Sequence, residues 1–138
     1  MKAVHILLQL LIVLSFSTII LTRSGNLSDN LPMKSTIPDS EKRYAVYSLP
    51  EYEESERSCP VLYLLHGGGD DQTGWVPSGK VLHITGKAIR ECLATPVIIA
   101  MPDTGTGHKG FFNSVKWDFP YKVFFFERFK PYSEKMQG

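Results

Sequence analysis

The chain has few cysteines and almost no net charge, and each shortage excludes a class of protein. Its 138 residues include two cysteines, Cys59 and Cys92, too few for a disulfide scaffold or a four-cysteine zinc site. Lys and Arg total 15 and Asp and Glu total 14, a net charge of +1, so no charge pattern suggests a nucleic-acid partner. With 43% hydrophobic and 21% charged residues, the composition is that of a globular chain.

Residues 1–23 differ from the rest of the chain. Lys2 gives a positive start, and an apolar run from Ile6 to Leu21 follows, interrupted by four polar residues. This order predicts an export signal and a periplasmic or secreted protein. The run is of intermediate length between a signal and a membrane span, and no A-x-A cleavage site stands out. An uncleaved membrane anchor and a buried helix are therefore the alternatives, and contact with a membrane is expected only through this segment.

Export would place Cys59 and Cys92 in an oxidising compartment. A bridge between them is one option. Two free thiols are favoured, because we expect Cys59 at the start of a strand and Cys92 inside a helix.

The remainder divides into two regions. Residues 24–42 are rich in Ser, Asn, Asp and Pro without a period, which predicts a linker. Residues 43–138 are expected to form a partial α/β domain, with strands at 43–48, 61–65 and 97–101. The last two are short continuous apolar runs, typical of fully buried parallel strands. Strands alternating with helices predict a parallel sheet covered on both faces.

Two sets of residues recur at helical spacing and define the expected buried faces of two helices. The first helix covers residues 81–93, and its face consists of Val81, Ile84, Ala88 and Cys92. The second follows a long loop at 103–120, and its face consists of Phe125, Phe129, Tyr132 and Met136. We expect Pro131 to kink or restart the second helix.

The strongest candidate site is the segment from His66 to Gly69, directly after the apolar run at 61–65. Glycine has no Cβ, so successive backbone N–H groups can converge on an anion at the carboxyl edge of a sheet. In acyl transfer that anion is the oxygen of the tetrahedral intermediate, and HGGG turns serve this role in lipases and esterases. The alternative is a turn that only reverses the chain. His66 fits a hydrogen-bonded structural role better than that of a general base.

Other motifs carry less weight. The segment from Gly105 to Gly110 fits G-x-G-x-x-G, but three residues separate it from the preceding strand and no helix opens after it, so a surface loop is favoured. The segment from Gly74 to Val81 nearly fits a P-loop but lacks its Ser or Thr. Neighbouring acids at Asp70 and Asp71 suit a turn better than a metal site. We therefore predict neither a cofactor nor a metal.

The sequence resembles a known family at this point. Landmarks that occur in order are the stretches at 44–50 and 60–71, the pair Gly74-Trp75, and the stretches at 96–103 and 121–134. Together they resemble the putative-esterase branch of the α/β-hydrolases, which includes feruloyl and acetylxylan esterases, S-formylglutathione hydrolases and mycolyltransferases. The similarity covers residues 43–135. It implies a serine hydrolase that acts on a small ester or an acylated carbohydrate.

The resemblance also implies site residues. The oxyanion donor would be the backbone N–H of Gly68, with Gly67 and Gly69 shaping the turn. Trp75 and His66 would lie beside the substrate pocket. No catalytic residue can be assigned, because the family's nucleophile lies in a Gly-x-Ser-x-Gly elbow and none occurs in these 138 residues.

We therefore expect the N-terminal half of an α/β-hydrolase sheet, truncated before the nucleophile elbow. Such a chain would lack nucleophile, acid, base and the second oxyanion N–H, and would be inactive alone. Its sheet would present an exposed apolar edge. Whether the chain is an enzyme stays open, and the alternative is a non-enzymatic exported or membrane-anchored interaction module.

Overall fold

A computed structural model describes residues 25–37, 39–50, 52, 58–105, 110–114 and 119–135. The predicted signal or anchor at 1–23 lies outside these residues, as do Trp117 and Met136. Within the described part of the chain, no helix combines the length and apolarity needed to cross a bilayer. Cys59 and Cys92 are both free, the first buried and the second exposed.

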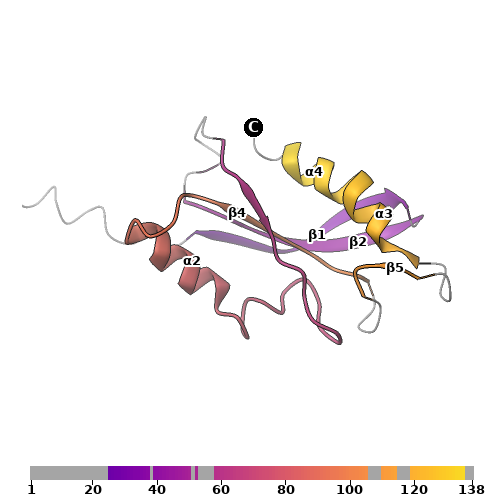
Figure 1. Ribbon diagram of the computed structural model, residues 1–138, viewed down its shortest axis with the longest axis horizontal. Helices are drawn as coiled ribbons and strands as arrows, with labels where there is room; N and C mark the ends of the chain where they lie inside the picture. Colours follow the sequence, from indigo (N-terminus) through magenta and orange to yellow (C-terminus); the bar gives the residue numbers. More distant parts are fainter. Residues whose placement is uncertain are drawn as a thin grey trace, which may run out of the picture.

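A four-stranded sheet forms the centre of the molecule, in the order β1-β2-β4-β3 (Figure 1). The strands are β1 (Asn26–Thr36), β2 (Asp39–Ser48), β3 (Val61–Tyr63) and β4 (Ile98–Pro102). β2 is antiparallel to both β1 and β4, and only β3 and β4 are parallel. The prediction of a parallel sheet is therefore wrong for the N-terminal strands. A short loop joins β1 to β2, and such a connection can only produce an antiparallel pair.

The predicted linker at 24–42 is wrong, because β1 and the start of β2 lie there. In the second half of β1, Leu31, Met33 and Ser35 point inward while the residues between them are exposed. Ser35 occupies a buried position and pairs its hydroxyl with the backbone N–H and C=O of Ile37. The sequence did not show the two-residue period of a strand, because Ser35 is a polar residue on the inward face and the segment is rich in turn-forming residues. Pro32 is tolerated because β1 is an edge strand.

Side chains alternate between the two faces of the sheet, and each face supports a core cluster. On one face Met33, Tyr44 and Ala100 pack with the C-terminal helical segment. On the other Ala45, Tyr47, Ile99 and Met101 pack with α2 (Val81–Arg90). In Figure 1, α2 and the pair α3 and α4 lie on opposite sides of the sheet. The prediction of a sheet covered on both faces is confirmed.

α2 is shorter than the expected helix at 81–93 and is rotated from its expected face. Its buried residues are Val81 and Gly86, whereas Ile84 is 58% exposed. Gly86 faces Tyr47, and a Cβ built on it would lie 3.5 Å from the Tyr47 hydroxyl, an ordinary van der Waals contact. Cys92 is not inside the helix but follows its end, with a left-handed φ of 56°.

The C-terminal helical segment comprises α3 (Tyr121–Phe124), the π-helical turn η1 (Phe125–Phe129) and α4 (Lys130–Glu134). Its buried residues are Tyr121, Phe124, Phe129 and Ser133. Of the expected face, Phe129 is buried and Phe125 is partly buried and packs against the core, as predicted. Tyr132 is 39% exposed, although its ring contacts Tyr44. The face did not include Tyr121, Phe124 and Ser133, because the wide π turn changes the phase of the helix. Pro131 lies in the first turn of α4, where a missing N–H costs little, as expected for a restart.

β4 is buried at every residue, as its apolar sequence predicts. β3 is not fully buried as predicted, because it pairs with β4 alone and forms an edge of the described sheet. Leu62 is 45% exposed and Leu65, beyond the strand, is 40% exposed. The exposed apolar edge expected from the sequence is present at β3. Within the expected loop at 103–120, β5 (Asn113–Ser114) and β6 (Phe119–Pro120) pair as a two-stranded sheet.

Candidate functional site

The candidate site lies at the carboxyl ends of β3 and β4. These strands are in parallel register, with Tyr63 opposite Ala100, so both chains leave the sheet at the same edge. His66 follows Tyr63 by three residues and Asp103 follows Ala100 by three. The register therefore brings His66 and Asp103 together, and the His66 Nε2 lies 3.4 Å from Asp103 Oδ1.

The glycine turn follows His66 directly. The Asp70 N–H donates to the Gly67 carbonyl at 3.3 Å, and Gly69 has a φ of 85°. A closing hydrogen bond with a positive φ at the third residue is the geometry of a type II turn. Gly69 is the position at which this turn requires glycine.

Gly67 and Gly68 are fully open to their surroundings. A Cβ built on either one meets nothing within 4 Å. Among the described residues, no acceptor receives a hydrogen bond from the backbone N–H of Gly67, Gly68 or Gly69. The segment predicted to bind an oxyanion thus presents unpaired donors on an exposed surface, which an anion can approach without steric hindrance.

His66 is buried, with 8% of its surface exposed, and both ring nitrogens have partners. Nδ1 lies 2.8 Å from the Gly67 carbonyl oxygen, and Nε2 accepts the Thr104 N–H at 3.3 Å. The Phe111 ring contacts the imidazole edge-on, with centroids 4.8 Å apart. These contacts support the hydrogen-bonded structural role rather than that of a general base, which needs a nitrogen free to take a substrate proton.

Tyr121 also contacts the backbone just after β4. Its hydroxyl donates to the Asp103 carbonyl at 3.0 Å, and burial raises the pKa of this phenol above its ordinary value. Sequence reasoning missed Asp103, Thr104 and Tyr121 as supports of the site. The available signal was the parallel register, which aligns the residues after two adjacent strands.

The segment after the turn is fixed by its acidic residues and by Trp75. Asp71 accepts hydrogen bonds from the Thr73 N–H and hydroxyl, each at 2.7 Å, and the pKa of its carboxyl is lowered, chiefly by these bonds. The Asp70 carboxylate packs against Gly74. Both acids thus serve the turn, as predicted. Within the described residues, no group of three or more His, Cys, Asp or Glu is arranged to hold a metal ion.

Trp75 lies close to the glycine turn. Its indole N–H donates to the Leu65 carbonyl at 2.9 Å, and the residue as a whole is 38% exposed. This contact anchors Trp75 to the residue that precedes His66 and leaves part of the tryptophan open to solvent. The central residues of the Gly105–Gly110 motif, 106–109, lie outside the described part of the chain.

Comparison with known proteins agrees with this arrangement. A family model described as Putative esterase matches residues 35–136. Two curated esterases from strains of Mycobacterium tuberculosis are each 42% identical over 65 residues, which is 46% of this chain and 12% of theirs.

Solved structures show the same fold. A ferulic acid esterase matches with a TM-score of 0.75 and 26% identity, over 84% of this chain and 45% of that one. A ferulic acid esterase from Anaeromyces mucronatus, solved with ferulic acid, matches with a TM-score of 0.63 and 21% identity, over 83% of this chain and 44% of that one. S-formylglutathione hydrolase from Staphylococcus aureus matches with a TM-score of 0.54 and 13% identity, over 77% of this chain and 40% of that one. The chain therefore spans less than half the length of each of these solved proteins.

Proposed function

Because the chain belongs to the Putative esterase family, we propose that it supplies the oxyanion-binding part of a site that hydrolyses carboxylic esters. The observation that carries this proposal is the exposed turn after β3, in which the Gly68 N–H has no acceptor among the described residues. Donors held in place before the reaction stabilise the charge that develops on the carbonyl oxygen, and this effect is often the largest single contribution to catalysis.

We place the nucleophile, the acid and the base outside these residues. The 138 residues contain no Gly-x-Ser-x-Gly segment, and the chain matches 45% of a ferulic acid esterase. An oxyanion site and substrate binding without the triad leave at most about 10³–10⁴-fold acceleration over water. The chain also lacks the second oxyanion N–H, which the residue after the nucleophile supplies. We therefore expect the chain alone to hydrolyse p-nitrophenyl acetate little or no faster than a heat-treated sample.

For the complete site we propose a small ester or an acylated carbohydrate as substrate. The support is the family and the likeness to ferulic acid esterases. Trp75 and the open side of the turn would face the acyl or alcohol group. Nothing in the described residues favours a feruloyl over an acetyl group.

We further propose that the protein is exported through residues 1–23, on the strength of their sequence pattern. N-terminal sequencing of protein recovered outside the cytoplasm tests this. A start shortly after Arg23 supports export with cleavage. An intact Met1 in the membrane fraction would instead support the anchor, and an intact Met1 in the cytoplasm would overturn both.

One observation favours a second candidate function, a non-enzymatic interaction module. β3 is an edge strand of the described sheet and exposes Leu62, and such edges pair readily with another chain. The two candidate functions differ in whether a nucleophile is required: the esterase needs one from outside these residues, and the interaction module needs none. Sequencing the gene beyond codon 138 in all three frames distinguishes them, because the esterase requires Gly-x-Ser-x-Gly followed by an acid and a histidine.

If such a segment follows, the joined chain should hydrolyse esters, and two variants test the role of Gly68. Gly68→Ala keeps the N–H, and its Cβ meets nothing within 4 Å. Gly68→Pro removes the N–H at the second position of the turn, where proline is common. We expect Ala to retain activity and Pro to lower kcat by about 10²–10³-fold. Equal activity of the two variants would refute the oxyanion role.

A further inference from the structure

We propose that His66 is a positioning residue, which fixes the Gly67–Gly68 peptide so that the Gly68 N–H points to the open side of the turn. This rests on the proposed function, because it concerns the donor of the same site. A trans peptide is planar, so its C=O and N–H point in opposite directions. Whatever holds the Gly67 carbonyl therefore sets the direction of the Gly68 N–H.

The Gly67 carbonyl is held by two donors. The His66 Nδ1 lies 2.8 Å from it, and the Asp70 N–H donates to it at 3.3 Å. Because a carbonyl only accepts hydrogen bonds, Nδ1 must carry a proton. No side chain lies within 4 Å of the Cβ positions of Gly67 and Gly68, so these two hydrogen bonds are the contacts that we infer to orient the peptide.

The imidazole that holds the turn is itself held. Its Nε2 accepts the Thr104 N–H at 3.3 Å, and Phe111 packs against the ring. Of the two neutral tautomers, only the one with its proton on Nδ1 satisfies both backbone groups. The charged group beside the ring is Asp103, whose Oδ1 lies 3.4 Å from Nε2. His66 therefore connects the end of β4 to the oxyanion turn and transfers the rigidity of a buried strand to an exposed loop.

A mobile donor would stabilise the transition state less than a fixed one, because it must be ordered during the reaction. The effect would appear in kcat rather than in KM, since the oxyanion exists only in the transition state. His66 acts through Gly68 and does not itself touch substrate.

Two variants separate this role from general packing. In Asn the amide nitrogen is bonded to Cγ, as Nδ1 is in His, so His66→Asn keeps a donor for the Gly67 carbonyl. In Gln the amide lies one bond further out, at the place of Nε2, so His66→Gln keeps an acceptor for Thr104 and loses the donor to Gly67. A residue that only fills space would respond similarly to both changes.

The test is backbone ¹⁵N relaxation of the full chain, which needs no enzymatic activity. We expect a Gly68 order parameter near 0.85 in the original chain and in His66→Asn, and below about 0.6 in His66→Gln. A Gly68 that is flexible in the original chain, or that responds equally to both variants, would overturn the proposal.

A second measurement on the unaltered chain covers the case in which a variant does not fold. Ring ¹⁵N chemical shifts of His66 report which nitrogen carries the proton. A proton on Nδ1 supports the proposal, and a proton on Nε2 alone refutes it. A rigid, His66-dependent turn combined with full activity of Gly68→Pro would leave the positioning role intact and remove the proposed function, so the two failures are distinguishable.

Discussion

The two faces of the sheet are covered very differently. On the side of α3, η1 and α4, the buried side chains are large rings in edge contact, such as Phe129 against Tyr44 at 5.6 Å between centroids. On the side of α2, the helix buries only Val81 and a glycine. In β3, Val61 and Tyr63 pack on the first face, and Leu62 between them points to the second face, where it is 45% exposed. Large buried aromatic side chains therefore cover one face of the sheet, whereas the helix on the other face buries little side-chain surface.

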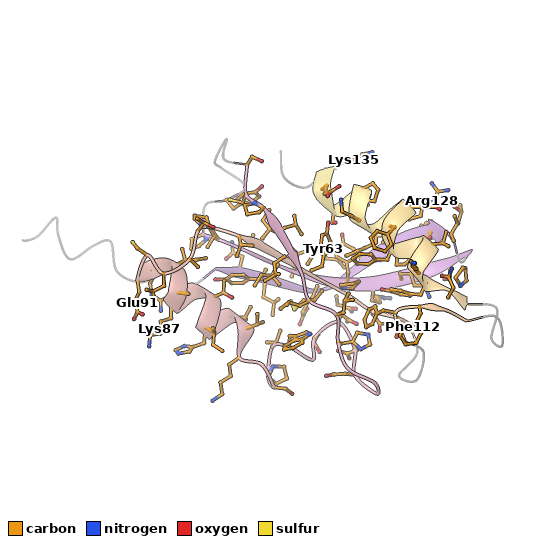
Figure 2. All side chains as sticks on the ribbon, in the orientation of Figure 1. Tyr63, Lys87, Glu91, Phe112, Arg128 and Lys135 are labelled. Carbon is orange, nitrogen blue, oxygen red and sulfur yellow. The ribbon has the colours of Figure 1, made fainter. Side chains whose placement is uncertain are left out.

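Figure 2 shows this contrast in the side chains. Tyr63 lies beside the C-terminal helical segment, whereas Lys87 and Glu91 lie at the outer end of α2. Exposed Lys87 and Glu91 form a 3.9 Å ion pair, the kind of surface contact that contributes little to stability. Stability should therefore depend mainly on the aromatic face. Four substitutions test this.

The largest effect is expected for Phe129→Ala. The ring is buried and contacts Tyr44, Tyr63 and Phe124, so its removal leaves a cavity. We expect the free energy of unfolding to fall by about 3–5 kcal/mol, measured by urea titration of the full chain. Phe126→Ala is the matched control, because Phe126 lies in the same π turn but is largely exposed. Similar losses in both variants would show that the aromatic face is not the anchor.

Tyr63→Phe should have an intermediate effect on the same face. It removes the 2.8 Å hydrogen bond between the Tyr63 and Ser133 hydroxyls and keeps the ring. Ser133 retains its bond to the Lys130 carbonyl, so the loss should be about 0.5–1.5 kcal/mol. The change in the urea midpoint of unfolding, with an unchanged dependence of the unfolding free energy on urea, would measure this loss. A neutral result would mean that ring packing alone joins β3 to α4.

Gly86→Ala should slightly stabilise the face that α2 covers. Alanine favours a helix interior over glycine by up to about 1 kcal/mol. The added Cβ would meet the flexible end of Arg90 at 3.1 Å and the Tyr47 hydroxyl at 3.5 Å, which the arginine can accommodate. A rise in melting temperature is the expected result. A clear fall would show that α2 packs on the sheet as tightly as the aromatic segment does.

The smallest effect is expected for Ile84→Ser, because this side chain is largely exposed on α2. Surface substitutions of this kind usually change stability by less than about 0.5 kcal/mol. Thermal unfolding of the full chain measures it. A loss above 1 kcal/mol would mean that something covers Ile84 in solution, and the apparent molecular mass of the sample would then show whether it is a second copy.

Both strands that flank the site follow from the sequence, although only β4 is fully buried and β3 is partly exposed. The apolar runs before His66 and Asp103 favour strands over helices, because they are short and are bounded by Pro or Gly. The glycine turn was identified for the same reason, since a strand preceded it. Period counting failed at β1, where Ser35 occupies an inward position. In the C-terminal helical segment, which contains a π turn, it found Phe125 and Phe129 but missed the buried Tyr121, Phe124 and Ser133.

The sequence by itself determined the local conformations: an apolar strand, a turn that needs glycine at position 69, and a helix restarting near Pro131. It also carries the ordered landmarks of the family. Only the tertiary structure decided what His66 does. Its partners, Gly67 and Thr104, are separated by 37 residues in the chain and meet because β3 and β4 run parallel in one register. Local chemistry depends on neighbours along the chain, whereas the direction of a backbone N–H depends on groups that only folding brings together.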